Sequence, residues 1–210
     1  MSLTVNGSSA SSIEPIPEGT HLAVCSMLID LGLQYSEQYK NSSRKVLIGW
    51  EIPEETIELD DGPHPRTISK RYTASLNEKS NLRADLAAWR GRDFSPEELA
   101  AFDLRNIVGK SCLVNIIHST REGKTYANIG SVMALPKGMQ KGTLSEPPTV
   151  FDLDTDPLEM VDNFPKWIGD IIKKSSTYQD RLTPPPAAAA ADEGGTTFQE
   201  LDNDDGTIPF

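Results

Sequence analysis

A change of hydrophobic period in the middle of the chain limits the possible folds more than any other feature. Before this point, residues 20–33, 45–52 and 66–75 alternate apolar with polar side chains or are rich in β-branched and aromatic residues. That pattern is typical of β-strands. Two similar segments, 111–119 and 125–135, follow it and are joined by a short turn, which predicts a hairpin. The sequence therefore predicts five strands, divided three and two by an insertion.

The insertion has the spacing of α-helices. From Leu82 to Trp89 apolar residues recur at i, i+4 and i+7, while Ser75-Leu-Asn-Glu78 has the form of a capping box and Gly91 stands where a helix would end. A second, shorter helix is predicted from Ser95-Pro-Glu-Glu98, because an N-cap serine is followed by proline at the first helical position.

We therefore expect an all-β protein with a helical insertion. Three strands, helices and two further strands is the order of the OB-fold, a five-stranded Greek-key β-barrel that commonly binds oligonucleotides. A five-stranded SH3-like barrel or a small α+β sheet would give similar patterns. Strand order alone leaves these folds open.

The two ends of the chain differ in composition from the middle. Residues 1–15 show no periodicity, and residues 183–197 are rich in Pro, Ala and Gly, so neither stretch buries enough apolar surface to offset the entropy of ordering. One helical candidate lies near 165–175, and its apolar face docks on the barrel, mediates self-association or covers the binding groove. We expect a disordered N-terminus (1–15), a folded domain (16–141), an acidic extension (142–182), a linker (183–197) and an acidic C-terminal tip (198–210).

The formal net charge of −11 is unevenly distributed along the chain. Residues 1–141 carry 16 Lys and Arg against 17 Asp and Glu, whereas residues 142–210 carry 4 against 14. Within the domain, residues 66–124 contain 11 basic and 7 acidic residues, while residues 51–61 contain six carboxylates and no base. The acidity therefore belongs mainly to the tail, and one part of the domain suits a phosphate backbone.

The sequence offers no pattern for catalysis, metal binding or membrane insertion. Its three histidines are scattered, and it lacks Cys-x-x-Cys, His-x-x-x-His, Gly-x-Ser-x-Gly and phosphate-binding glycine motifs. No apolar run is long enough to span a bilayer, and the N-terminus has no signal-peptide pattern. Cys25 and Cys112 lie in strand-like runs and fit buried free thiols in a reducing compartment. We expect a cytoplasmic binding protein without enzymatic activity, cofactor, metal or small-molecule substrate.

Single-stranded DNA is bound by cations that follow the phosphates and by aromatic faces on which bases stack, each stack contributing about 1–3 kcal/mol. Alternation places Lys70 and Tyr72 on one face of their strand and Arg71 on the other. The sequence leaves open whether Tyr72 and Tyr126 stack on bases or pack in the core. The candidate DNA-binding residues are Lys70, Arg71, Tyr72, Lys79, Arg83, Arg90, Arg92, Lys124, Tyr126 and Asn128.

The C-terminus carries the most specific motif, in which Asp202, Asp204 and Asp205 precede Ile208-Pro209-Phe210. A purely solubilising tail has no use for exposed Ile and Phe. In this motif the chain resembles bacterial-type single-stranded DNA-binding proteins, whose OB-fold is followed by a linker and an acidic tip ending in Ile-Pro-Phe. Family tips run their aspartates directly into this tripeptide, whereas Gly206-Thr207 intervenes here.

The resemblance implies a role for the tip. Its terminal Phe would enter an apolar pocket on replication, recombination or repair proteins, while the aspartates meet basic residues. By position this partner-binding role passes to Asp202, Asp204, Asp205, Ile208, Pro209 and Phe210.

The domain itself looks like the single-stranded DNA-binding proteins encoded by tailed bacteriophages. The resemblance covers about residues 17–139 and implies an OB-fold, DNA binding during phage replication or recombination in the host cytoplasm, and no catalytic activity. It transfers no contact residues. The segments that carry it are Val46-Leu-Ile-Gly-Trp-Glu-Ile52, Ser69-Lys-Arg-Tyr-Thr73, Trp89-Arg-Gly-Arg92 and Tyr126-Ala-Asn128.

A protein–protein adaptor, which presents a peptide on a barrel without binding nucleic acid, is the alternative from a different class. The uneven charge also predicts that the acidic tip competes with DNA for the basic surface of the domain, because the linker holds the tip close to that surface.

Overall fold

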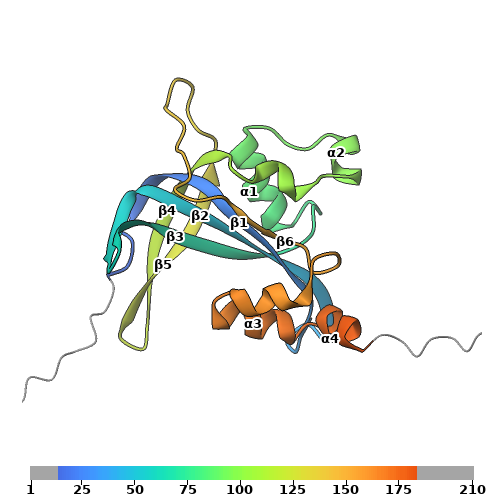
Figure 1. The fold of residues 1–210 in the computed structure, drawn as a ribbon. Helices are drawn as coiled ribbons and strands as arrows, with labels where there is room; N and C mark the ends of the chain where they lie inside the picture. The colour runs from blue at the N-terminus through green and yellow to red at the C-terminus, as the bar shows by residue number, and fades with distance from the viewer. Residues whose placement is uncertain (1–13, 184–210) are drawn as a thin grey trace, which may run out of the picture.

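The computed structural model of this protein describes residues 14–183 (Figure 1). Residues 1–13 and 184–210 lie outside the described residues, so the predicted roles of Asp202, Asp204, Asp205 and Ile208-Pro209-Phe210 stay predictions. The elements are, in chain order, β1 (Gly19–Ser36), β2 (Asn41–Leu59), β3 (Gly62–Thr73), α1 (Asn81–Arg90), α2 (Pro96–Ala100), the 3-10 helix η1 (Leu104–Ile107), β4 (Ser111–Arg121), β5 (Lys124–Met133), β6 (Thr149–Phe151), the 3-10 helix η2 (Leu158–Asn163), α3 (Lys166–Lys173) and α4 (Ser176–Leu182).

The sheet is mainly antiparallel, in the order β3-β2-β1-β4-β5, and the short β6 pairs in parallel with β1. The helices α1, α2 and η1 lie between β3 and β4, which confirms the prediction of a β protein with a helical insertion. The predicted terminal hairpin is formed by β4 and β5. β3 and β5 stand at the two ends of the strand order, and no ladder joins them among the described residues.

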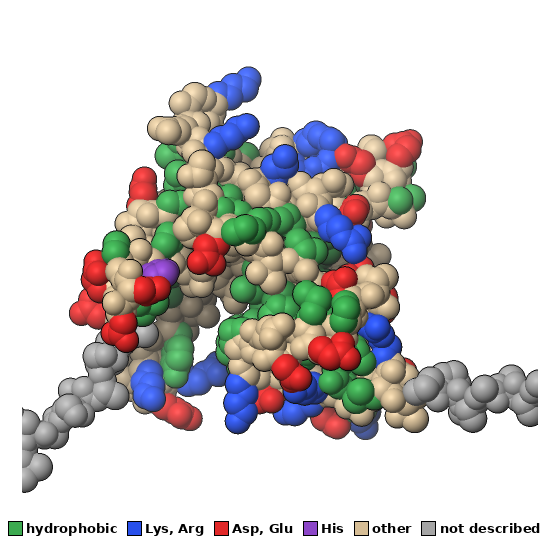
Figure 2. All heavy atoms as spheres, viewed as in Figure 1, with side chains coloured by type: hydrophobic (Ala, Val, Ile, Leu, Met, Phe, Trp, Pro, Cys, Tyr) green, Lys and Arg blue, Asp and Glu red, His purple; other side chains and the backbone are tan. Residues whose placement is uncertain are grey.

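The first three strands are longer than predicted. β1 and β2 continue as a hairpin to Ser36 and Asn41, and β2 and β3 run through residues 54–65, which lie between two of the predicted strands. A register shift between Ile52 and Thr56 accommodates Pro53, which has no amide hydrogen to donate. The five carboxylates of residues 54–61 therefore gather near the far end of the β2–β3 hairpin, at the left edge of Figure 2.

The first inserted helix ends as predicted but begins later. α1 starts at Asn81, because the chain still turns at Ser80, whose hydroxyl donates to the carbonyl of Ser75 at 2.6 Å. The predicted capping box at 75–78 is therefore wrong. Gly91 ends α1 with a φ of 70°, a conformation that glycine adopts readily, and α2 has its predicted capping box at 95–98.

One face of the sheet packs against α1 and forms the first core. Leu82 and Trp89 are buried on α1, and the Trp89 ring centroid lies 6.0 Å from that of Trp50 on β2. Cys25 and Cys112 are buried free thiols in this core, as predicted. Burial raises the pKa of Cys25 to about 12, so this thiol stays protonated at neutral pH.

The opposite face of β1 and β2 is covered by the C-terminal block, which we define as residues 149–182 (Figure 1). Because successive strand residues point to opposite faces, Leu47 of β2 packs here while its neighbour Val46 belongs to the first core. The helix predicted near 165–175 is α3, and its buried Ile168 and Ile172 dock on the sheet, one of the alternatives left open by the sequence. None of the described helices is long and apolar enough to cross a membrane.

Candidate nucleic-acid interface

A groove of about 690 Å³ lies at the end of the β1–β2 hairpin, beside the last residues of β3 and the connection to α1. We call it the polar groove. None of its lining residues is Asp or Glu. They are the cations Lys45, Lys70, Arg71 and Lys79, the tyrosines Tyr35, Tyr39 and Tyr72, the amides Gln34, Asn41, Asn77 and Asn81, the hydroxyl residues Ser36, Ser43, Thr73, Ser75 and Ser80, and Leu82.

The polar groove is cationic although the chain as a whole is acidic. Among the described residues, Lys45, Arg71 and Lys79 have no carboxylate partner, and the Nζ of Lys45 donates to the Oγ1 of Thr73 at 2.6 Å. Lys70 differs, because its Nζ lies 2.7 Å from Oδ2 of Asp85 on α1. Cations without an internal counter-charge are available to phosphate oxygens, and each such contact strengthens binding in a salt-dependent way.

Two tyrosines of the polar groove present their rings to solvent. Tyr35 is 59% exposed and Tyr39 is 71% exposed, and both belong to the end of the β1–β2 hairpin. A large aromatic ring in a polar turn is available for stacking on an unpaired base. The groove therefore combines cations, exposed aromatic faces and amide side chains.

The C-terminal block supports the side of the groove that carries these tyrosines. The backbone N–H of Leu33 donates to Oγ1 of Thr177 at 3.0 Å, and Nε2 of Gln34 donates to the carbonyl of Ile171 at 3.0 Å. Gln34 itself lines the groove. Residues far along the chain therefore fix the end of the β1–β2 hairpin in place.

The structure brings together four of the predicted DNA-binding residues, Lys70, Arg71, Lys79 and Tyr72, in the lining of this groove. Tyr72, however, is only 4% exposed and packs in the first core, so its ring is not open to a base. Its hydroxyl donates to Oδ2 of Asp85 at 2.7 Å, and burial together with the nearby Asp85 charge raises the pKa of Tyr72. The sequence left open whether Tyr72 stacks on bases or packs in the core, and in the structure it packs in the core.

The predicted arginines of the helical insertion are already paired with carboxylates. Arg83 forms two hydrogen bonds with Asp93, at 3.1 and 2.8 Å, and this contact raises the pKa of Arg83. Arg90 and Arg92 both donate to Glu98, whose pKa is held at about 2, mainly by Arg92. These three arginines do not line the groove, and their predicted role in DNA binding stays a prediction.

The remaining predicted residues lie on the β4–β5 hairpin, outside the groove lining. Lys124, Tyr126 and Asn128 alternate on the exposed side of β5, and Tyr126 is 49% exposed. The amide of Asn128 donates to Ser119 on β4 at 2.9 Å. Tyr126 is therefore available for stacking, in contrast to Tyr72.

Sequence reasoning missed Tyr35, Tyr39 and Lys45 as site residues. They lie in residues 34–45, of which 34–44 were assigned to no strand because the apolar pattern stops at Leu33. The available signal was composition, since two tyrosines stand among Gln, Ser, Asn and Lys in a connection between strands. Exposed tyrosines in a polar connection favour binding over packing.

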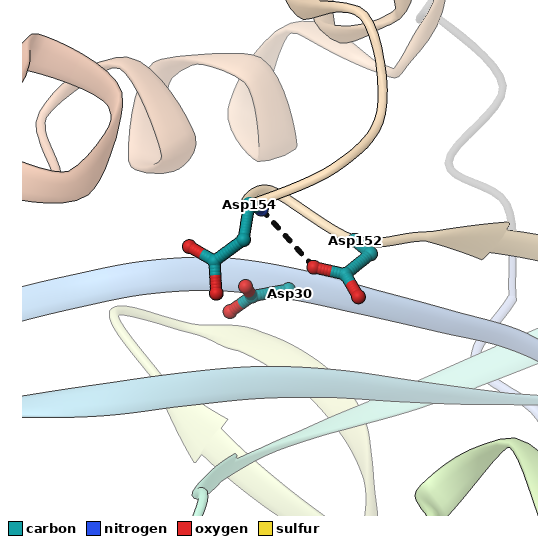
Figure 3. Close-up of side chains that lie close together, drawn as sticks. All are labelled: Asp30, Asp152 and Asp154. Carbon is teal, nitrogen blue, oxygen red and sulfur yellow. Dashed lines mark hydrogen bonds between the residues drawn. The ribbon is translucent and has the colours of Figure 1, made fainter. Parts of the chain in front are cut away.

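A cluster of three carboxylates lies between the sheet and the C-terminal block (Figure 3). Asp30 of β1 and Asp152 and Asp154, which follow β6, bring carboxylate oxygens within 4.8 Å of one another. Arg44 donates to both Asp30 and Asp154, and Arg105 donates to Asp152 at 2.6 Å. These guanidinium groups compensate the negative charge, so the cluster fastens the C-terminal block to β1 and β2.

No protein-family model and no curated protein matches the chain.

Proposed function

We propose that this protein binds single-stranded DNA, largely without sequence preference, and that the polar groove is the main contact surface. The observation that carries the proposal is the lining of the groove, which has four cations, two exposed tyrosines and no carboxylate. Single strands are bound by this combination, because cations follow the backbone while aromatic rings stack on bases of any identity.

The strand order supports an OB-fold as the framework of this site. The order β3-β2-β1-β4-β5, with helices between β3 and β4, fits an open or closed five-stranded Greek-key barrel. OB-folds bind oligonucleotides over their second and third strands and the flanking first and last connections. The polar groove lies on β2, β3 and the β1–β2 connection, in agreement with that mode.

Recruitment of replication, recombination or repair proteins is the second part of the proposal. It depends on the acidic tip, with Asp202, Asp204, Asp205 and Ile208-Pro209-Phe210, and on the resemblance of that tip to bacterial-type single-stranded DNA-binding proteins. The setting we propose is the cytoplasm of a bacterial host.

A binding assay with labelled DNA tests the proposal. Trp50 and Trp89 are buried and no tryptophan lines the groove, so fluorescence anisotropy of a labelled oligo-dT is a better readout than tryptophan quenching. We expect oligo-dT to bind more tightly than a duplex of equal charge, with a log–log salt slope of about −0.7 for each phosphate contacted. Equal affinity for both would refute stacking, and the absence of binding at low salt would favour the adaptor alternative.

A further inference from the structure

Asp85 stands directly behind the cationic wall of the polar groove without lining it. Its Oδ2 accepts a hydrogen bond from Nζ of Lys70 at 2.7 Å and another from the hydroxyl of Tyr72 at 2.7 Å. Both donors belong to β3 and line the groove, whereas Asp85 belongs to α1. One carboxylate oxygen therefore holds two groove residues at once.

This arrangement divides the groove cations into two kinds. Lys45, Arg71 and Lys79 have no carboxylate partner among the described residues, whereas the charge of Lys70 is compensated at hydrogen-bond distance. The Lys70 and Asp85 side chains are 26% and 18% exposed, so water screens their interaction less than it would at the open surface. A phosphate that approaches Lys70 is also repelled by the nearby Asp85.

We propose that Asp85 is a built-in counter-ion that keeps the affinity of the polar groove for nucleic-acid phosphates below the maximum its cations would allow. Lys70 is then a latent phosphate contact, whose contribution is suppressed in the native protein. This inference rests on the proposed function of the groove and adds an affinity-determining residue that itself does not touch the ligand. Moderate affinity keeps a bound strand exchangeable.

The variant Asp85→Asn tests the inference, because asparagine keeps an acceptor for the Tyr72 hydroxyl while removing the charge. In Asp85→Asn, one additional phosphate contact should steepen the log–log salt slope by about 0.7. The ratio of the variant's affinity for oligo-dT to that of the native protein should therefore be roughly five- to tenfold higher at about 50 mM salt than at about 1 M salt. Lys70→Met should not raise the affinity, because it leaves the charge of Asp85 uncompensated beside the groove. Asp85→Asn combined with Lys70→Met should lose the gain.

Asp93→Asn is the matched control. It removes one negative charge from the same helical insertion, but its partner Arg83 lies outside the groove lining. We expect Asp93→Asn to leave the slope unchanged, which separates a local effect from the change in net charge. Tyr72→Phe removes the second hydrogen bond to Asp85 without changing charge, and should also leave the slope unchanged.

The inference is overturned if Asp85→Asn behaves like Asp93→Asn, if it lowers the affinity, or if the gain persists when Lys70 is also replaced. These results leave the proposed function intact, because the native protein still binds oligo-dT. If the native protein does not bind oligo-dT at low salt, the proposed function fails and the inference fails with it. Thermal unfolding of each variant shows whether the fold is retained.

Discussion

Replacing the exposed tyrosines of the polar groove should weaken DNA binding without weakening the fold. Tyr35 and Tyr39 are 59% and 71% exposed, so truncation to alanine removes little buried surface. Exposed substitutions away from structural features change the free energy of unfolding by about 0.5 kcal/mol or less. Loss of one base stack costs about 1–3 kcal/mol of binding free energy.

The expected loss of affinity for Tyr39→Ala is therefore about 5- to 150-fold, since about 1.4 kcal/mol corresponds to a factor of ten. Stacking involves no counter-ion release, so the loss should be the same at low and high salt and the salt slope should not change. Anisotropy titration of labelled oligo-dT at two salt concentrations measures both quantities. Urea denaturation of the same variant measures the free energy of unfolding.

Two variants make this test specific. Tyr39→Phe keeps the ring and should keep the affinity, because the hydroxyl is not needed for stacking. Tyr126→Ala removes an exposed tyrosine outside the groove and should cause a smaller loss. If Tyr39→Ala binds like the native protein while Tyr126→Ala does not, the polar groove is not the binding surface and the reasoning is refuted.

Four further predictions concern charge, packing and pH. Arg71→Ala should reduce the salt slope of oligo-dT binding by about 0.7. Arg83→Ala should leave the slope unchanged, because the guanidinium of Arg83 is paired with a carboxylate in the native protein. Equal slopes for the two variants would contradict the assignment of Arg71 to the binding surface. Ile172→Ala should lower the free energy of unfolding by about 2–5 kcal/mol in a single urea transition, because this side chain is fully buried between the C-terminal block and the sheet; two separate transitions would show an independent block. The pKa of the Glu98 carboxylate is lowered from 4.5 to about 2. Glu98→Gln should therefore be less stable than the native protein above about pH 4.5, and this difference in stability should vanish as the pH falls through 2. Acid unfolding followed by circular dichroism measures the difference, and a difference that persists below about pH 2 contradicts the prediction. Deletion of residues 198–210, which carry only acidic charges, should raise oligo-dT affinity at low salt and have little effect near physiological salt, where the Debye length is about 8 Å; an unchanged affinity in anisotropy titrations at low salt would show that the tip does not compete.

The order of elements could be predicted because hydrophobic period is a local property of the sequence. The switch at 75–92 and the hairpin after residue 111 are visible in that period, and both are present. The second core was predicted only in part: docking of the helix near 165–175 was one alternative, but its place on the sheet was not predicted. Val46 and Leu47 are adjacent apolar residues of one strand, and the sequence does not say which element covers the outward one. That element begins about one hundred residues later, at β6.

The site residues could be predicted only in part, because the state of an arginine or a tyrosine depends on its neighbours in space. Arg71 and Arg83 are the same residue type twelve positions apart, yet only Arg83 finds a carboxylate partner, after the turn that follows α1. Tyr72 lies on the same face of β3 as the buried Ile68, and it is buried as well. Tyr39 lies in a turn, where no alternation applies.

The distribution of charge along the β2–β3 hairpin bears on the route of a bound strand. One end of this hairpin carries Lys45 and Arg71, and the other carries the carboxylates of residues 54–61. Arg71 lies ten positions after Asp61 along an extended strand, about 33 Å away, which is several Debye lengths at physiological salt. The carboxylates of residues 54–61 therefore do not weaken the attraction between the groove cations and phosphates. They do repel any phosphate that turns toward them, so DNA should cross the hairpin rather than follow it, which keeps the footprint of one molecule short.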